Sequence, residues 1–287
     1  MLFRSPLCAR RGHGVRPEGP GHIQILSARR PRIAVRGLAK TFRERTREVP
    51  AVRDVSFEVA DAEFVAIVGP SGCGKSTILN MLGGLVAPSA GAIEVDGRPV
   101  TDVPPRVGYV FQRDTVFPWR TVLRNIALGL EYRGVRGAEL EARVREGIRL
   151  AGLEGFEDAF PATLSGGMRQ RVALMRTLVV DPEILLMDEP FGALDTHTKL
   201  TLHAELLGLW EARHQTVVFV THDLSEAITL ADRIIVMTRR PGRIKLVHDV
   251  RISRPRDVIK LRETDEYAHE YGVIWHVLGE ELAEPGP

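Results

Sequence analysis

Apolar residues occur along the chain in short runs separated by charged and turn-forming positions, which predicts a series of strands. The first two runs alternate apolar and polar residues and are joined by a charged hairpin over 43–48. The run at 64–68 is apolar throughout, as in a strand that is buried on both faces. The predicted strands are 32–38, 52–59, 64–68, 93–95, 107–111, 184–187, 217–220 and 234–237.

Helices are predicted where the apolar period lengthens to three or four residues. This period runs over 140–148 and over 168–179, and the second pattern ends at Asp181-Pro182. The other predicted helices are 77–82, 122–130 and 200–212, and the block 116–162 is expected to be a helical insert. Strands that alternate with helices predict an α/β fold, with a largely parallel sheet covered on both faces.

The composition narrows the class of protein. The chain has 287 residues, of which 44% are hydrophobic and 26% charged, so a large buried core is expected and global disorder is not. No apolar stretch approaches about 18 residues, so no membrane-spanning helix is predicted and any work at a membrane must involve a partner. Two cysteines, Cys8 and Cys73, cannot build a disulfide framework, and they fit a reducing cytosol.

Charge is distributed unevenly between the start of the chain and the rest. The net charge of +2 is too small to favour a nucleic-acid partner, but residues 1–40 hold nine basic residues and one acidic residue. Residues 1–30 are therefore expected to be a basic, disordered extension. The main domain is predicted over 31–245, followed by a helical or irregular C-terminal extension over 246–287.

A glycine-rich loop follows the buried strand at 64–68. Residues 69–76 read G-P-S-G-C-G-K-S and match the phosphate-binding pattern G-x-x-x-x-G-K-[ST]. Glycines let successive backbone N–H groups surround a phosphate, Lys75 adds positive charge, and Ser76 can bind Mg²⁺. A helix follows, which directs its positive N-terminal end at the phosphates. Cys73 is expected to fill space, because phosphoryl transfer needs no thiol nucleophile.

Two adjacent carboxylates end the apolar strand at 184–187. Asp188 is predicted to lie beside the phosphate loop, where it can hold Mg²⁺ directly or through water. Adjacent strand residues point to opposite sides, so Glu189 is free to orient or deprotonate an attacking water. Together with the phosphate loop, this pair predicts hydrolysis of a nucleoside triphosphate.

Residues 164–170 read L-S-G-G-M-R-Q, and this segment resembles the L-S-G-G-Q signature of ABC transporter ATPases. The signature lies 23 residues before Asp188, as the family pattern requires. Gln112 resembles the family's Q-loop glutamine, Leu194-Asp195 its D-loop, and His222 its switch histidine. Phe42 resembles the aromatic residue that stacks on adenine. The resemblance covers roughly 32–245.

The resemblance implies a RecA-like P-loop NTPase core with an antiparallel β subdomain and a helical subdomain. It also implies a head-to-tail dimer in which the signature of one subunit completes the ATP site of the other. The expected catalytic residues are Lys75, Gln112, Glu189 and His222, and the expected Mg²⁺ ligands are Ser76, Gln112 and Asp188. The residues expected to bind nucleotide are Phe42, Gly69, Ser71, Gly72, Cys73, Gly74, Lys75, Ser76, Thr77, Ser165, Gly166, Gly167 and Asp195.

Two further segments narrow the resemblance. Residues 117–122 read F-P-W-R-T-V and residues 239–244 read R-R-P-G-R-I, both similar to the nitrate, sulfonate and taurine importer branch. This branch implies membrane permease subunits, an extracytoplasmic solute-binding protein and a peripheral position on the cytoplasmic face of the cell membrane. ATPases that import thiamine precursors share these segments. A lipid or lipoprotein exporter ATPase and an ABC ATPase without a permease are the alternatives.

Overall fold

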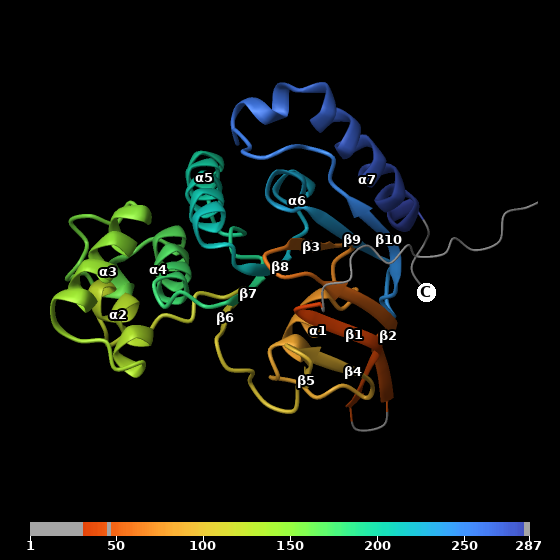
Figure 1. Ribbon diagram of the computed structural model, residues 1–287, viewed down its shortest axis with the longest axis horizontal. Helices are drawn as coiled ribbons and strands as arrows, with labels where there is room; N and C mark the ends of the chain where they lie inside the picture. Colours follow the sequence, from red (N-terminus) through yellow and green to blue (C-terminus); the bar gives the residue numbers. More distant parts are fainter. Residues whose placement is uncertain (1–30, 45–46, 284–287) are drawn as a thin grey trace, which may run out of the picture.

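The computed structural model describes residues 31–44 and 47–283, so the predicted basic extension over 1–30 lies outside the described residues. A six-stranded sheet forms the centre of the molecule, in the order β10-β9-β3-β8-β7-β6 (Figure 1). Its strands run parallel except for β10, which is antiparallel to β9. Their bounds are β3 Phe64–Val68, β6 Val107–Val110, β7 Ile184–Asp188, β8 Thr216–Val220, β9 Arg233–Met237 and β10 Ile244–Asp249.

The central sheet is covered on both faces, as predicted, and successive strand residues enter different cores. Phe64, Ala66 and Val68 of β3 pack with the core on the side of α5, α6 and α7, whereas Val65 and Ile67 pack with α1. Burial on both faces explains why β3, β7 and β8 are apolar runs rather than alternating strands. The covering helices are α1 Lys75–Leu82, α5 Thr196–Arg213, α6 Leu224–Leu230 and α7 Asp265–Ala283 (Figure 1).

A second, antiparallel sheet lies against α1, in the order β2-β1-β4-β5. Its first hairpin is longer than the sequence pattern predicts, because strand pairing continues through the charged positions. There Arg43 Nε donates to Glu48 Oε1 on the opposite strand at 3.0 Å. Register shifts between Val35 and Thr41 break the apolar alternation there. The bounds are β1 Ile33–Glu44, β2 Arg47–Val59, β4 Ala90–Val95 and β5 Arg98–Pro99.

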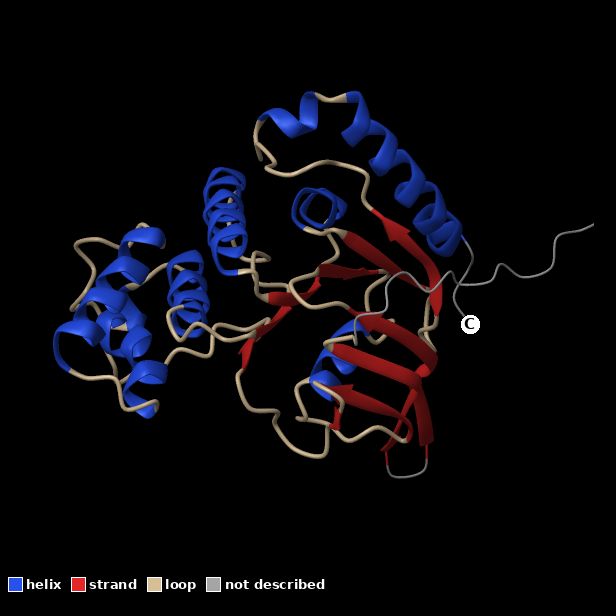
Figure 2. Cartoon of the chain, viewed as in Figure 1, coloured by secondary structure: helices blue, strands red, loops and turns tan. Residues whose placement is uncertain are grey.

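The predicted helical insert forms a separate lobe beside the sheet (Figure 2). It contains α2 Val122–Tyr132, α3 Gly137–Leu150 and the short 3₁₀ turn Pro161–Thr163. The lobe also includes α4 Gly166–Leu178, which packs against both α2 and α3. It therefore extends beyond the boundary predicted at residue 162, because the apolar face of α4 completes the core of α2 and α3.

The C-terminal segment is part of the core rather than an extension. The boundary predicted after residue 245 falls inside β10. The sequence pattern does not predict this strand, because an edge strand carries both polar and apolar residues and so lacks a continuous apolar run. The buried guanidinium of Arg256 donates to the carbonyls of Ile228, Thr229 and Ala231 at the end of α6. After a 3₁₀ turn at Lys260–Glu263, α7 packs against α6 and β9. Among the described residues, no helix has the length and apolar character needed to cross a membrane.

Candidate functional site

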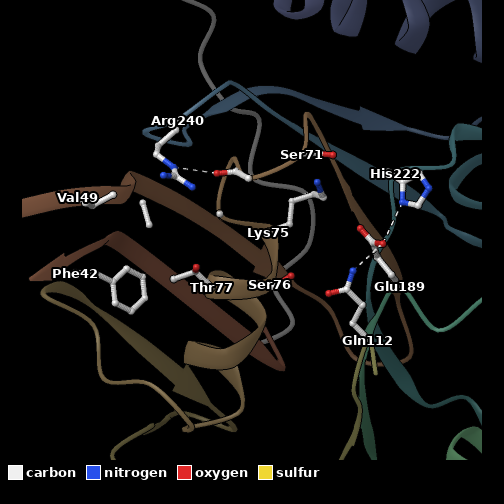
Figure 3. A pocket seen from close by; sticks show the side chains of 13 residues that line it. Phe42, Val49, Ser71, Lys75, Ser76, Thr77, Gln112, Glu189, His222 and Arg240 are labelled. Atoms are coloured by element: carbon white, nitrogen blue, oxygen red, sulfur yellow. Dashed lines mark hydrogen bonds and ion pairs between the residues drawn. The ribbon is translucent and has the colours of Figure 1, made fainter. Parts of the chain in front are cut away.

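A pocket of about 520 Å³ opens at the carboxyl edge of the central sheet (Figure 3). Loops that follow four neighbouring parallel strands meet there, since the carboxyl ends of parallel strands share one edge. These loops follow β3, β6, β7 and β8, and the antiparallel sheet closes one side. The lining residues are Phe42, Val49, Ala51, Ser71, Gly72, Gly74, Lys75, Ser76, Thr77, Gln112, Glu189, His222 and Arg240.

The phosphate loop forms the floor of this pocket. Gly74 precedes α1 with φ 106°, and a Cβ there would lie 2.7 Å from Val52 Cγ2, so glycine is required on both grounds. Lys75 Nζ donates to the carbonyls of Gly69 at 2.8 Å and Pro70 at 3.1 Å. Cys73 is buried and does not line the pocket, and burial raises the pKa of its thiol. A buried, protonated thiol fits the space-filling role that the sequence predicts.

Ser76 and Asp188 meet although 112 residues separate them. Ser76 Oγ donates to Asp188 Oδ1 at 2.9 Å, which links the start of α1 to the end of β7. Burial raises the pKa of Asp188, the Ser76 hydrogen bond opposes this rise, and the charge of Glu189 adds to it. A buried carboxylate beside a hydroxyl is an oxygen donor set of the kind that Mg²⁺ prefers.

Glu189 is the centre of a polar cluster with Gln112 and His222, at the end of the pocket away from Phe42 (Figure 3). Its Oε2 accepts a hydrogen bond from Gln112 Nε2 at 3.2 Å and lies 3.1 Å from His222 Nδ1. Glu189 has φ 46°, a left-handed conformation that is strained for a residue with a Cβ, by about 1–3 kcal/mol. Its backbone N–H is held by the carbonyl of Val220, so strand pairing with β8 maintains the strained geometry.

The aromatic ring of Phe42 lies at the opposite end of the pocket from His222 (Figure 3). Val49 is its cross-strand partner in the first hairpin and also lines the pocket. Lys40 Nζ lies 5.2 Å from the centre of the Phe42 ring, a cation–π contact that fixes the ring. At 40% exposure, Phe42 leaves much of its surface open for a planar ligand.

The signature residues are near one another but outside this pocket. Ser165 caps α4, its Oγ accepting from Met168 N at 3.2 Å, and Gly166 and Gly167 form the first turn. Asp195 caps α5 by accepting from Thr198 N at 3.0 Å. Both caps are exposed. Of the predicted nucleotide-binding residues, Gly69, Cys73, Ser165, Gly166, Gly167 and Asp195 do not line the pocket.

Two side chains join the start of α4 to the pocket loops. Gln170 is buried and donates from Nε2 to the carbonyl of Pro190 at 2.9 Å, directly after Glu189. Arg169 Nε donates to Asp114 Oδ2 at 2.7 Å, two residues after Gln112. The start of α4 is therefore tied to the loop that carries Glu189 and to the loop that carries Gln112.

A family model described as ABC transporter matches residues 52–192. An uncharacterized ABC transporter ATP-binding protein of Methanocaldococcus jannaschii is 45% identical over 251 residues, which is 88% of this chain and 92% of the relative. This chain belongs to the ABC transporter ATPases. It binds ATP and hydrolyses it, as the enzymes of this family do.

Other relatives of this ABC ATPase agree in sequence and in fold. The aliphatic sulfonates import ATP-binding protein SsuB of Bacillus cereus is 41% identical, covering 78% of this chain and 88% of SsuB. A dimeric, post-hydrolysis structure of the ATP-binding cassette MJ0796 bound to ADP and Pi matches with a TM-score of 0.71. That cassette is 34% identical, and the match covers 77% of this chain and all of the cassette. These matches confirm the predicted P-loop NTPase fold.

Three pocket residues of this ABC ATPase were not expected from the sequence. Val49 and Ala51 are on β2, and Arg240 is on the loop between β9 and β10. The pairing of Val49 with Phe42 follows from the hairpin register, so that residue could have been found from strand pairing. Arg240 lies within the R-R-P-G-R-I segment, but only the tertiary structure brings it next to the phosphate loop.

Proposed function

We propose that this ATPase is the nucleotide-binding subunit of an ABC importer for a small solute such as nitrate, a sulfonate or taurine. The similarity to SsuB of Bacillus cereus carries this proposal, since it runs over most of both chains. The F-P-W-R-T-V and R-R-P-G-R-I segments, which resemble the same importer branch, are consistent with it. The choice of solute resides in the permease and the solute-binding protein.

Different residues of the pocket have different roles in hydrolysis. Negative charge develops on the phosphoryl group as it leaves, and Lys75 and the backbone N–H groups of the phosphate loop stabilise it. Glu189 orients the attacking water and accepts its proton, and its contacts with Gln112 and His222 connect that carboxylate to residues able to detect the γ-phosphate. The Phe42 ring stacks on adenine, and its cross-strand partner Val49 lines the same end of the pocket.

Ser76, Gln112 and Asp188 are the residues that would hold Mg²⁺. Ser76 Oγ and Asp188 Oδ1, 2.9 Å apart, present two oxygen atoms at the end of the phosphate loop, and Gln112 lines the same pocket. A bound Mg²⁺ would supply charge neutralisation on the β and γ phosphates. Within the described residues, no cluster of three or more His, Cys, Asp or Glu side chains that could hold a metal ion is found.

The active form is a head-to-tail dimer in which each ATP lies between the phosphate loop of one subunit and the signature of the other. The separation of Ser165, Gly166, Gly167 and Asp195 from the pocket of their own chain supports this arrangement. The similar MJ0796 cassette is dimeric in its structure with bound ADP and Pi. The exposed N-terminus of α4 presents partial positive charge, as a γ-phosphate requires.

The helical lobe presents an aromatic surface suited to a membrane permease. Trp119 is 71% exposed and its ring centre lies 5.3 Å from that of Phe117, in a tilted arrangement. Trp119 and the exposed Phe160 both line one surface hollow. An exposed aromatic patch of this kind marks a protein contact site. Arg169 on α4 donates to Asp114, which lies in the loop between Gln112 and the aromatic surface. A permease bound to the aromatic surface can therefore respond to whether the pocket holds nucleotide. The permease would place this subunit on the cytoplasmic face of the membrane.

A lipid or lipoprotein exporter shares the hydrolytic residues, so the direction of transport needs its own test. The decisive experiment is to reconstitute this chain with a candidate permease and a candidate solute-binding protein from the same organism. The proposed function predicts that ATP hydrolysis rises when the loaded binding protein is added from the outside. Stimulation by a lipid substrate instead would establish the exporter alternative.

A further inference from the structure

The segment Thr238–Arg243 joins β9 to β10 and packs directly against the phosphate loop. Gly242 N donates to the carbonyl of Ala51 at 2.9 Å, and Arg53 N donates to the carbonyl of Gly242 at 3.0 Å. A Cβ at Gly242 would lie 2.1 Å from the carbonyl oxygen of Cys73, so glycine alone permits this approach. Backbone contacts thus fix this segment at the edge of the nucleotide pocket.

Arg240 extends from this segment over the phosphate loop (Figure 3). Its Nε donates to the carbonyl of Gly72 at 3.1 Å, and Nη2 lies 3.4 Å from where a Cβ on Gly72 would be. Arg240 lines the pocket between Val49 and the phosphate loop, on the side away from the Glu189 cluster. The preceding residue is anchored as well, since Arg239 N donates to Glu281 Oε2 on α7 at 2.9 Å.

The charges around the pocket favour a ligand role for this guanidinium. Among the lining residues that the structure describes, Lys75 and Arg240 are the Lys or Arg side chains, and Glu189 is a carboxylate. A triphosphate brings several negative charges, and a second cationic side chain would add to the neutralisation by Lys75 and the proposed Mg²⁺. Nε is one of the five N–H donors of a guanidinium, and its planar fork matches the oxygens of a phosphate.

We propose that Arg240 is a further nucleotide-binding residue, whose guanidinium contacts the phosphate chain of ATP and ADP beside Gly72. This role rests on the proposed function of the pocket as the nucleotide site. It assigns a chemical task to a side chain of the R-R-P-G-R-I segment, beyond the backbone contacts that this segment makes with β2 and the phosphate loop. The hydrogen bond to Gly72 sets the guanidinium against the loop before nucleotide binds.

The test compares the full-length Arg240→Gln, Arg240→Lys and Arg243→Gln variants. Arg243 is exposed, lies in the same segment and does not line the pocket, so its variant removes the same charge without the contact. Equilibrium affinities for Mg-ATP, Mg-ADP and adenosine are measured at low and high salt. Arg240→Gln is expected to weaken ATP and ADP binding by about 10-fold or more, as for loss of a charged hydrogen bond, and to leave adenosine unchanged. The ATP affinity of Arg240→Gln should also depend less steeply on salt concentration than that of the wild type.

Each outcome bears on the role of Arg240. Recovery of part of the affinity in Arg240→Lys, with Arg243→Gln equal to wild type, supports a contact through charge. Equal ATP affinity in Arg240→Gln and wild type overturns it. A similar loss for adenosine and ATP also overturns it, because the guanidinium would then only hold the shape of the pocket. Failure of the wild-type chain to bind ATP would instead refute the assignment of the pocket itself.

Discussion

The carboxyl edge of the central sheet and the N-terminus of α4 carry the two halves of the site in different ways. At the sheet edge, Lys75, Gln112, Glu189 and His222 each follow a different strand and line one pocket. At α4, Ser165, Gly166 and Gly167 are sequence neighbours that lie outside it. A parallel sheet collects distant residues within one chain, whereas a helix terminus presents adjacent residues to a surface that another molecule must supply.

The largest effect is expected at the sheet edge. Lys75→Ala removes the ammonium that lies along the phosphate loop, so Mg-ATP binding or turnover should be lost, with a fall of about 10³-fold or more in hydrolysis. Steady-state phosphate release measures this loss, and Lys260→Ala, an exposed lysine outside the pocket, is the matched control. Turnover within about twofold of the wild type would contradict the assignment of the pocket.

Removal of the Glu189 charge should separate binding from chemistry. Glu189→Gln keeps the side-chain shape and the strained backbone but cannot accept a proton from water, so hydrolysis should fall by about 10²–10³-fold while ATP affinity is kept. The variant should then accumulate an ATP-bound dimer, seen by size-exclusion chromatography in Mg-ATP. Elution as a monomer only would count against a site shared between subunits.

Mixed dimers test whether the signature acts on the partner. Lys75→Ala damages the site on its own chain, and Ser165→Arg places a bulky cation where the signature would meet the partner's nucleotide. With one mutation on each chain, both defects fall in one site and the other stays whole. With both mutations on one chain, each site carries one defect. In a Glu189→Gln background, occlusion of about one ATP per dimer is expected only in the first arrangement. Equal occlusion in both would refute the shared site.

Removal of a hydrogen bond that connects α4 to the sheet edge should have a smaller effect. Gln170→Leu removes the hydrogen bond to the carbonyl of Pro190 and leaves that carbonyl buried beside an apolar side chain. Hydrolysis is expected to fall by about 10-fold, because α4 no longer fixes the position of the loop that carries Glu189. ATP affinity should stay within about twofold of the wild type. Arg145→Gln, on the exposed face of α3, should change neither quantity. An equal loss of affinity and turnover would show a general packing defect.

The smallest effect is expected at α5, which follows the loop after β7. His203 on α5 packs against Phe191 at 4.5 Å between ring centres, and within the described residues neither of its ring nitrogens has a hydrogen-bond partner. Burial, with help from the charges of Lys199 and Arg262, lowers the pKa of His203 to about 4. Protonation therefore favours the unfolded chain as the pH falls from about 6.5 to about 4, and stability is lost across this range.

Replacing this histidine should flatten the pH dependence of stability. In His203→Leu, the fall in the free energy of unfolding between neutral pH and about pH 4 should be smaller by up to roughly 3 kcal/mol, from the size of the pKa shift. Urea denaturation at several pH values measures it, with His276→Leu, an exposed histidine on α7, as the control. Parallel pH profiles for His203→Leu and the wild type would rule out this effect.

Much of this site could be predicted from sequence because its motifs combine local residues with strong backbone requirements. Gly74 must take φ 106° next to Lys75, and buried strands such as β7 need unbroken apolar runs, so both leave a visible pattern. The tertiary structure alone decided which distant groups meet. The contact of Arg240 with Gly72 and the tie from Gln170 to Pro190 join segments whose spacing in sequence carries no signal.

The same reason explains the errors at the boundaries. β10 is an edge strand with polar residues, and α4 belongs to the helical lobe through an apolar face that a sequence pattern cannot assign to a partner. Local conformation follows from the chemistry of neighbouring residues, and the sequence determines it directly. The choice of which surfaces pack together depends on burying apolar area and pairing polar groups across the whole chain, and only the folded structure decides it.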